Sequence, residues 1–219
     1  DNGLKKAGRA KEIAYQTLKI AKEQKLDIEK ALFDNNARVA GNSTTARELA
    51  GAPAWLTSNV SRGTGGASAT GDGTDAATDG TQRAFTQTLF DTVMQSIWVS
   101  GGKPNKVFLS AFQMDAALGF TGNNNQRSTI GAADGKVANL LNIYMTPWGS
   151  VEFMPCRESR SRDVFIMQSD MWAVGVLRPT KNVELAKTGD STKRQVVTEL
   201  TLVCKNEASS GVVADLTTS

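Results

Sequence analysis

The chain has 219 residues, 40% of them hydrophobic, and a formal charge of +3 at neutral pH. It can bury a core but has neither a run of about 18 apolar residues nor an apolar signal segment, so we expect a globular cytoplasmic chain without a membrane span. Histidine is absent and Cys156 and Cys204 are far apart, which excludes Ser-His-Asp and Cys-His catalysis, imidazole zinc sites and a dense cysteine framework.

The small positive charge is concentrated near the N-terminal end. Residues 1–38 hold nine Lys/Arg and six Asp/Glu, whereas the remaining 181 residues hold sixteen of each. This surplus is too small for a dedicated DNA-binding protein. It suits either a solvated helix face or a surface that lies near a polyanion without reading its sequence.

The first predicted element is one long amphipathic helix from Leu4 to about Asn35. Its apolar residues recur every three or four positions; they are Leu4, Ala7, Ala10, Ala14, Leu18, Ala21, Ile28 and Leu32. At 1.5 Å per residue the helix would extend roughly 45 Å. Alanine is common on this stripe, so we expect a close-packed neighbour, and the polar residues 34–36 and Gly41 end the pattern.

Residues 57–80 consist almost entirely of Gly, Ser, Thr, Ala and Asp. Such a composition cannot build a core, so the segment is predicted to be an exposed, mobile loop. Its glycines are not followed by the Gly-Lys-[Ser/Thr] of a phosphate-binding loop, which argues against a nucleotide site.

A second helix is predicted to begin near residue 81 and to end at Gly101-Gly102. Its apolar face is formed by Phe85, Leu89, Val93 or Met94, and Ile97 or Trp98. A short buried strand at 107–109, a helix capped by Ser110 that runs through Leu118, and a polar loop at 121–135 complete a strand–helix unit.

The rest of the chain is mostly strand. Strands are predicted at 139–145, 151–154, 163–168, 172–177, 196–204 and 211–216. Helices first and antiparallel-type strands later indicate the α+β class. The strands at 172–177 and 196–204 flank a polar, charged loop, which predicts a long hairpin.

No pattern in the sequence supports catalysis. The carboxylates lack the spacing of a calcium loop or a two-metal centre. Ser43, Ser110 and Ser169 lie in no Gly-x-Ser-x-Gly turn, and a serine nucleophile would need a lysine base that no motif identifies. The four tryptophans lie among apolar neighbours, which indicates core or interface positions. We therefore expect no catalytic, cofactor-binding or metal-binding residues.

Charged side chains in two places are candidates for contacts with another subunit. The connection 157–162 is the densest basic cluster outside the first helix. It indicates either a solvated loop or an intersubunit contact through Arg157 and Arg160, because a planar guanidinium pairs well with carboxylates. Charges at the tip of a hairpin likewise suit contact with a protein surface.

Several segments together resemble major capsid proteins of tailed bacteriophages. They are Ile97-Trp-Val-Ser-Gly-Gly-Lys-Pro104, Ser110-Ala-Phe-Gln113, Phe120-Thr-Gly122, Met171-Trp172, Leu177-Arg-Pro179, Glu184-Leu-Ala-Lys-Thr-Gly-Asp-Ser191, Lys193-Arg-Gln195 and Ala214-Asp-Leu216. The family is similar to the Hong Kong 97-type capsid fold, which encapsulin compartments and herpesvirus shells also use.

The resemblance implies an α+β Hong Kong 97-type fold with four parts. Residues 1–56 would hold the spine helix and the start of a peripheral domain, 57–81 an exposed loop, 82–177 most of the axial domain, and 178–219 the peripheral hairpin and its return. The hairpin tip would meet neighbouring capsomers near local three-fold positions. The resemblance thus implies candidate assembly contacts on the hairpin, which are Arg178, Glu184, Lys187, Asp190, Lys193 and Arg194. Proteins of this fold usually carry an N-terminal arm and an extended loop before the spine helix, so we expect these parts to lie upstream or to have been removed.

The function implied by the resemblance is that of a structural shell subunit. Copies of the chain would form hexamers and pentamers of an icosahedral virion shell around double-stranded DNA, assembled in the bacterial cytoplasm, with portal, scaffold or cement proteins as further partners and no cofactor. Two alternatives stay open. One is an encapsulin-like compartment shell; the other is an α+β enzyme, which requires a pocket with convergent polar groups and perturbed titrating residues.

Overall fold

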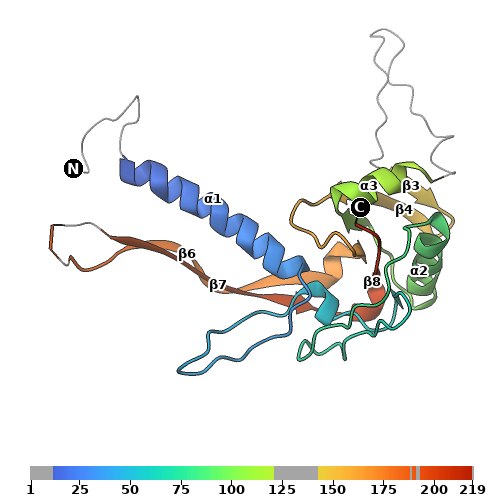
Figure 1. The fold of residues 1–219 in the computed structure, drawn as a ribbon, viewed down its shortest axis with the longest axis horizontal. Coiled ribbons are helices and arrows are strands. Elements are labelled where there is room, and N and C mark those ends of the chain that lie inside the picture. The colour runs from blue at the N-terminus through green and yellow to red at the C-terminus, as the bar shows by residue number, and fades with distance from the viewer. Residues whose placement is uncertain (1–11, 121–142, 188, 191–192, 219) are drawn as a thin grey trace, which may run out of the picture.

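The structure, a computed structural model, describes residues 12–120, 143–187, 189–190 and 193–218 (Figure 1). Two parts lie side by side. The arm consists of the helix α1 (Glu12–Phe33) and the hairpin of β6 (Trp172–Glu184) and β7 (Arg194–Cys204). The sheet domain holds a six-stranded sheet with the helices α2 (Gln87–Val99) and α3 (Ala111–Leu118). The expected mixture of helices and strands is confirmed.

The six-stranded sheet is mixed. Its order is β1-β8-β5-β2-β4-β3, and its strands are β1 (Val60–Ser61), β2 (Lys106–Leu109), β3 (Ile143–Thr146), β4 (Gly149–Pro155), β5 (Val164–Met167) and β8 (Gly211–Val213). The pairs β1/β8 and β2/β4 are parallel, so the expectation of antiparallel strands alone is wrong. Parallel pairing needs a long crossover, and α3 and β3 lie between β2 and β4 in the chain.

Helix α3 begins where the sequence predicts, whereas α2 begins at Gln87, later than the predicted start near residue 81. The Thr86 hydroxyl accepts a hydrogen bond from the Leu89 N–H, and Ser110 caps α3 in the same way through Gln113. Ile97, and not Trp98, belongs to the core, because Trp98 is 55% exposed. An aromatic cluster joins α2 to the sheet; its rings are Phe85, Phe90, Phe120, Tyr144 and Phe153.

The C-terminal strand lies in the middle of the sheet domain. Residues 212–216 are completely buried, and β8 pairs with β1 on one side and β5 on the other. Short 3₁₀ helices at Ala52–Ala54, Ser169–Met171 and Glu207–Ser209 lie in the chain between these strands and the arm. Residues 212–216 therefore belong to the core.

The expectation that residues 57–80 form an exposed loop is wrong for several of them. Val60–Ser61 is an edge strand, and Asn59, Ala69 and Ala77 are buried. The Asn59 amide donates to the carbonyls of Ala208 and Ser210 and accepts from the Ser96 hydroxyl. Small side chains leave the backbone free to pack closely, so a segment without large apolar residues is still fixed to the core.

Helix α1 is held mainly at its C-terminal end. It ends at Phe33, close to the predicted end, and the predicted positions 4–11 lie outside the described residues. The Phe33 ring packs between Phe108 and Phe165, with centroids 5.2 and 5.5 Å apart. No residue of α1 is fully buried, and Leu18, expected on the packed stripe, is 65% exposed. The arm therefore has apolar surface that its own subunit does not cover.

Replacement of Phe33 by alanine should remove the main attachment of α1. We expect the free energy of unfolding in urea to fall by about 3 kcal/mol, the low end for a core phenylalanine because Phe33 is only partly buried. The control is Phe112→Ala, since Phe112 is 41% exposed and should cost less than about 1 kcal/mol. Equal losses in the two variants would contradict this assignment.

Candidate assembly surface

The hairpin is longer than the sequence predicts. Strand β6 continues past residue 177 to Glu184, and β7 begins at Arg194, so Glu184 and Arg194 lie opposite each other and not in the loop. The Thr180 and Thr198 hydroxyls are 2.7 Å apart across the strands. Cross-strand pairs of this kind stabilise a ribbon beyond its apolar base.

Three of the predicted contact charges, Arg178, Glu184 and Arg194, are paired within the hairpin. The Arg178 guanidinium donates to both carboxylate oxygens of Glu199, with Nε 2.6 Å from Oε2, and this hydrogen bond lowers the pKa of Glu199. Arg194 lies 3.2 Å from Glu184. Both pairs join opposite strands, so their first effect is to hold the register of β6 against β7.

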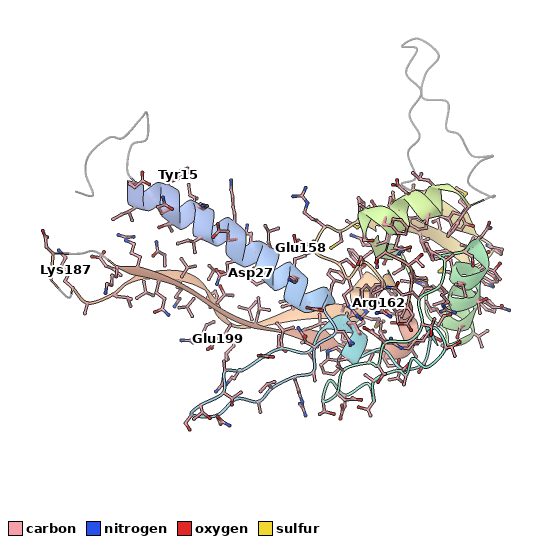
Figure 2. All side chains as sticks on the ribbon, in the orientation of Figure 1. Tyr15, Asp27, Glu158, Arg162, Lys187 and Glu199 are labelled. Atoms are coloured by element: carbon pink, nitrogen blue, oxygen red, sulfur yellow. The ribbon has the colours of Figure 1, made fainter. Side chains whose placement is uncertain are left out.

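The other three hairpin candidates, Lys187, Asp190 and Lys193, lie at the exposed tip. Figure 2 shows Lys187 at the outer end of the arm, remote from Arg162 in the sheet domain. Within the described part of the chain, none of the three has an ion-pair partner. They are the hairpin charges that stay available to another molecule.

The basic connection 157–162 contains an internal ion-pair network. Arg160 is 2.6 Å from Asp79 and 2.9 Å from Asp163, and Arg162 is 2.9 Å from Asp215. Asp163 and Asp215 are 1% and 0% exposed, and buried carboxylates need such compensation. Arg160 is thus neither in a solvated loop nor a free contact group, because its charge is balanced inside the subunit; Arg157 is exposed.

Asp215 is the last member of this network. We call Arg160, Arg162, Asp79, Asp163 and Asp215 together the arginine–aspartate cluster. Its backbone has the left-handed φ of 59°, which aspartate tolerates better than most residues. Its carboxylate accepts hydrogen bonds from the N–H groups of Gly63 and Gly80, at 3.0 and 2.8 Å. A Cβ at Gly80 would lie 2.6 Å from the Gly63 carbonyl oxygen, so the backbone approaches the carboxylate only through glycine.

Sequence reasoning missed Asp79 and Asp215 because their partners are remote in the chain. Asp79 lies 81 residues before Arg160 and Asp215 lies 152 after Gly63. The available signal was an aspartate inside the otherwise apolar run 212–216, since a buried carboxylate predicts an arginine or several N–H donors nearby.

The pKa values of the cluster follow from burial and pairing. Burial raises the pKa of Asp163, and the charges of Arg160 and Arg62 only partly oppose it. Burial also opposes ionisation of Asp79, but the hydrogen bond and charge of Arg160, with Arg162, outweigh it and lower the pKa. Burial lowers the pKa of Arg62, against the attraction of three carboxylates. These perturbed groups are explained by structural ion pairs.

The arm carries a groove of about 1500 Å³. It is lined by α1, the loop 38–50, residues 198–204 of β7, and Gly175 and Leu177 of β6. Cys204, at one end, has its pKa raised to about 11, chiefly by burial, so it is a thiol and a poor nucleophile at neutral pH. Asp79 and Asp163 do not line the groove, so the perturbed carboxylates and the hollow do not form one site.

Two features that other functions would require were also sought. Among the described residues, no helix combines the length and apolar character needed to cross a bilayer. In the same part of the chain, no three His, Cys, Asp or Glu side chains are grouped so that they could hold a metal ion.

Comparison with known proteins identifies the architecture. A family model described as SU10 major capsid protein matches residues 2–217, and no curated protein sequence matches. The cyanophage A-1(L) capsid subunit is similar in structure, with a TM-score of 0.59 at 14% identity over 97% of this chain and 72% of that one. The SrpI encapsulin of Synechococcus elongatus PCC 7942 has a TM-score of 0.55 at 10% identity, over 97% and 69%. The Hong Kong 97-type fold expected from the sequence is confirmed.

The arginine–aspartate cluster predicts a specific dependence of stability on pH. Because the folded pKa of Asp79 lies below its ordinary 3.8, its contribution is present above that value and is lost as pH falls through the folded pKa. In Asp79→Asn we expect the free energy of unfolding to fall less steeply with acidification than in the wild type, measured in urea between pH 7 and 3.

The matched control is Asp170→Asn, the same change at an exposed carboxylate, which should keep the wild-type slope. The Asp79 charge also raises the pKa of Asp163, so the measured slope reports both carboxylates. An Asp79→Asn slope equal to that of the wild type would show that Asp79 has no role in acid sensitivity.

Proposed function

The chain belongs to the SU10 major capsid protein family and is a structural subunit of a phage capsid shell, and we propose that its copies form hexamers and pentamers that close around double-stranded DNA. The family match carries this proposal. It also favours a virion over an encapsulin-like compartment, since the fold alone is shared by both. We propose assembly in the bacterial cytoplasm and no catalytic role.

The division of the subunit supports assembly through the arm. The sheet domain encloses a large apolar core, although Trp98, Val99 and Phe112 stay exposed, and it pairs its buried carboxylates internally. The arm leaves large apolar side chains exposed on both α1 and the hairpin; they include Tyr15, Leu18, Leu26, Val176, Leu177 and Val183. Exposed apolar surface of this extent is typical of protein interaction sites.

We propose that Lys187, Asp190 and Lys193 contact neighbouring capsomers. They lie at the outer end of a ribbon whose register Arg178 and Arg194 hold through Glu199 and Glu184. A rigid ribbon with unpaired charges at its end can reach another subunit with little loss of conformational entropy. Arg157, exposed on the sheet domain, is a further candidate; Arg160 is occupied within the chain.

Further partners follow from the virion role. Portal, scaffold and cement proteins would meet the same shell. DNA contact through α1 has weaker support: residues 12–33 hold four lysines and four acidic residues, so the positive surplus of the first 38 residues lies mostly in 1–11, outside the described residues. We propose non-specific proximity of DNA to the inner surface and no sequence readout.

Charge reversal at the tip tests the assembly contact. In Lys187→Glu with Lys193→Glu we expect shell yield to fall at least about tenfold, because reversed charges repel at a contact that recurs in every subunit. Shells are counted by electron microscopy of the full-length protein, and circular dichroism of the free subunit should be unchanged.

The control is the double variant Lys103→Glu with Lys205→Glu, in which two exposed lysines near the sheet domain are reversed. This variant should assemble normally. Wild-type yield from the tip variant would rule out these lysines as assembly contacts. A wild-type protein that stays a monodisperse monomer at high concentration would contradict the shell function itself.

A further inference from the structure

The six-stranded sheet is covered on one face and only partly covered on the other. On the first face, strand residues such as Val107 and Phe153 pack against α2 and α3 in one apolar core. On the second face, Phe108 and Phe165 pack against the last turn of α1 and residues 52–56. This second cover lies over β8, β5 and β2, and it leaves β4 and β3 open.

The uncovered part of the sheet exposes large apolar side chains. Successive residues of a strand point to opposite faces, and on β3 the buried Tyr144 lies between Ile143 and Met145, which are 57% and 66% exposed. In the register of β3 with β4, Ile143 lies beside Glu152 and Met145 beside Ser150. We call this surface the open face; its residues are Ile143, Met145, Ser150 and Glu152.

An open face is unusual beside a parallel pair of strands. Strands β2 and β4 are parallel, and parallel strands are normally covered by helices on both faces. Exposed apolar residues on such a face mark a contact with another molecule. Strand β4 has seven residues and spans roughly 23 Å, so the open face suits a helix of about four turns.

Helix α2 has an outer surface that matches the open face. Its 13 residues span roughly 20 Å, and Asp91 is their single charge. The side of α2 that faces the sheet is buried, whereas Trp98 and Val99 are 55% and 73% exposed. The other exposed residues of α2 are uncharged; they are Thr88, Thr92 and Gln95. Interface cores are likewise poor in charge and rich in aromatic residues.

The other two described helices suit the open face less well. Helix α1 carries four lysines and four acidic residues, and its base already lies over the covered part of the second face. Helix α3 has only eight residues, about two turns, and its Asp115 is exposed. Among the described helices, α2 therefore fits the open face best in both length and charge.

The two surfaces point in opposite directions. Helix α2 packs on the first face of the sheet through Phe90, so its outer surface points away from the sheet on that side, whereas the open face lies on the other side. Figure 1 shows α2 on the outside of the sheet domain, at the end remote from the hairpin tip. The surfaces cannot meet within one subunit. Between copies they meet head to tail, an arrangement that repeats and closes into a ring where the rotation allows.

We propose that the outer surface of α2 packs on the open face of a second copy of this chain. The choice of a second copy rests on the proposed shell function, in which each subunit has neighbours of its own kind. Trp98 and Val99 of one copy lie against Ile143 and Met145 of the other, and the removal of these side chains from water supplies the attraction. Each subunit contributes its helix to one neighbour and its open face to another.

Complementary charges test the contact. In Val99→Lys or Met145→Glu the new charge is buried against an apolar surface without a partner, so we expect the shell yield of either variant alone to fall at least about tenfold. In an equal mixture, the new ammonium group of one variant meets the new carboxylate of the other. The mixture should form at least about tenfold more assembled protein than either variant alone, measured by sedimentation.

Because Val99 and Met145 are exposed, circular dichroism and thermal unfolding of the free subunit should keep their wild-type values. The control is Phe112→Lys, in which the same charge replaces an exposed apolar residue of α3, and this variant should assemble normally. Wild-type shell yield from either single variant would overturn the proposal. So would a mixture that assembles no better than its components, or an equal loss in the Phe112→Lys control.

Oxidation of Met145 gives a second readout that needs no substitution. Hydrogen peroxide transfers one oxygen atom to the methionine sulfur, which gives the sulfoxide and releases water. Followed by mass spectrometry, this reaction should be at least about tenfold slower in shells than in dissociated subunits, because the contact covers the side chain. Equal rates would overturn the proposal. Failure of the wild type to form shells would instead contradict the proposed function.

Discussion

The buried carboxylate of Asp215 is the contact on which the order of the sheet domain depends. This carboxylate accepts hydrogen bonds from the N–H groups of Gly63 and Gly80 and from the guanidinium of Arg162. One side chain therefore fixes both ends of the segment 63–80, which has almost no apolar residues. A carboxylate without these donors would be strongly unfavourable in a core. The position of 63–80, the seating of β8 and the internal pairing of residues 160–163 are therefore linked.

This constraint separates two uses of charge in one subunit. In the sheet domain, the charges of the arginine–aspartate cluster are paired with one another, and its carboxylates Asp163 and Asp215 are buried. On the arm, charges are exposed, those along the strands brace the ribbon, and those at its end are unpaired. The contrast is weaker for apolar residues: the sheet domain encloses a core but exposes Trp98 and Phe112, and α1 and the hairpin leave Leu18 and Leu177 exposed.

Local signals predicted the local structure well. Ser110 as a cap, the end of α1 and the strands β2, β5 and β7 follow from side chains that act on their immediate neighbours. The errors concern interactions between distant residues. Arg160 looks like a surface residue until Asp79 and Asp163 are brought beside it, and residues 57–80 look unstructured until Asp215 binds their backbone. Leu18 is a third case, because helical periodicity shows that a stripe exists but not how far a neighbour extends along it.

Because α1 is attached mainly by its last turn, a small rotation there would move its far end by a large distance. Phe33 is held between two rings, and one turn earlier the Cys156 thiol donates to the Glu29 carboxylate at 2.9 Å. The 22 residues of α1 span roughly 33 Å, so a rotation of about 10° at Phe33 would displace the far end by about 6 Å. A small change of side-chain packing at the base would thus become a large change in where the arm reaches.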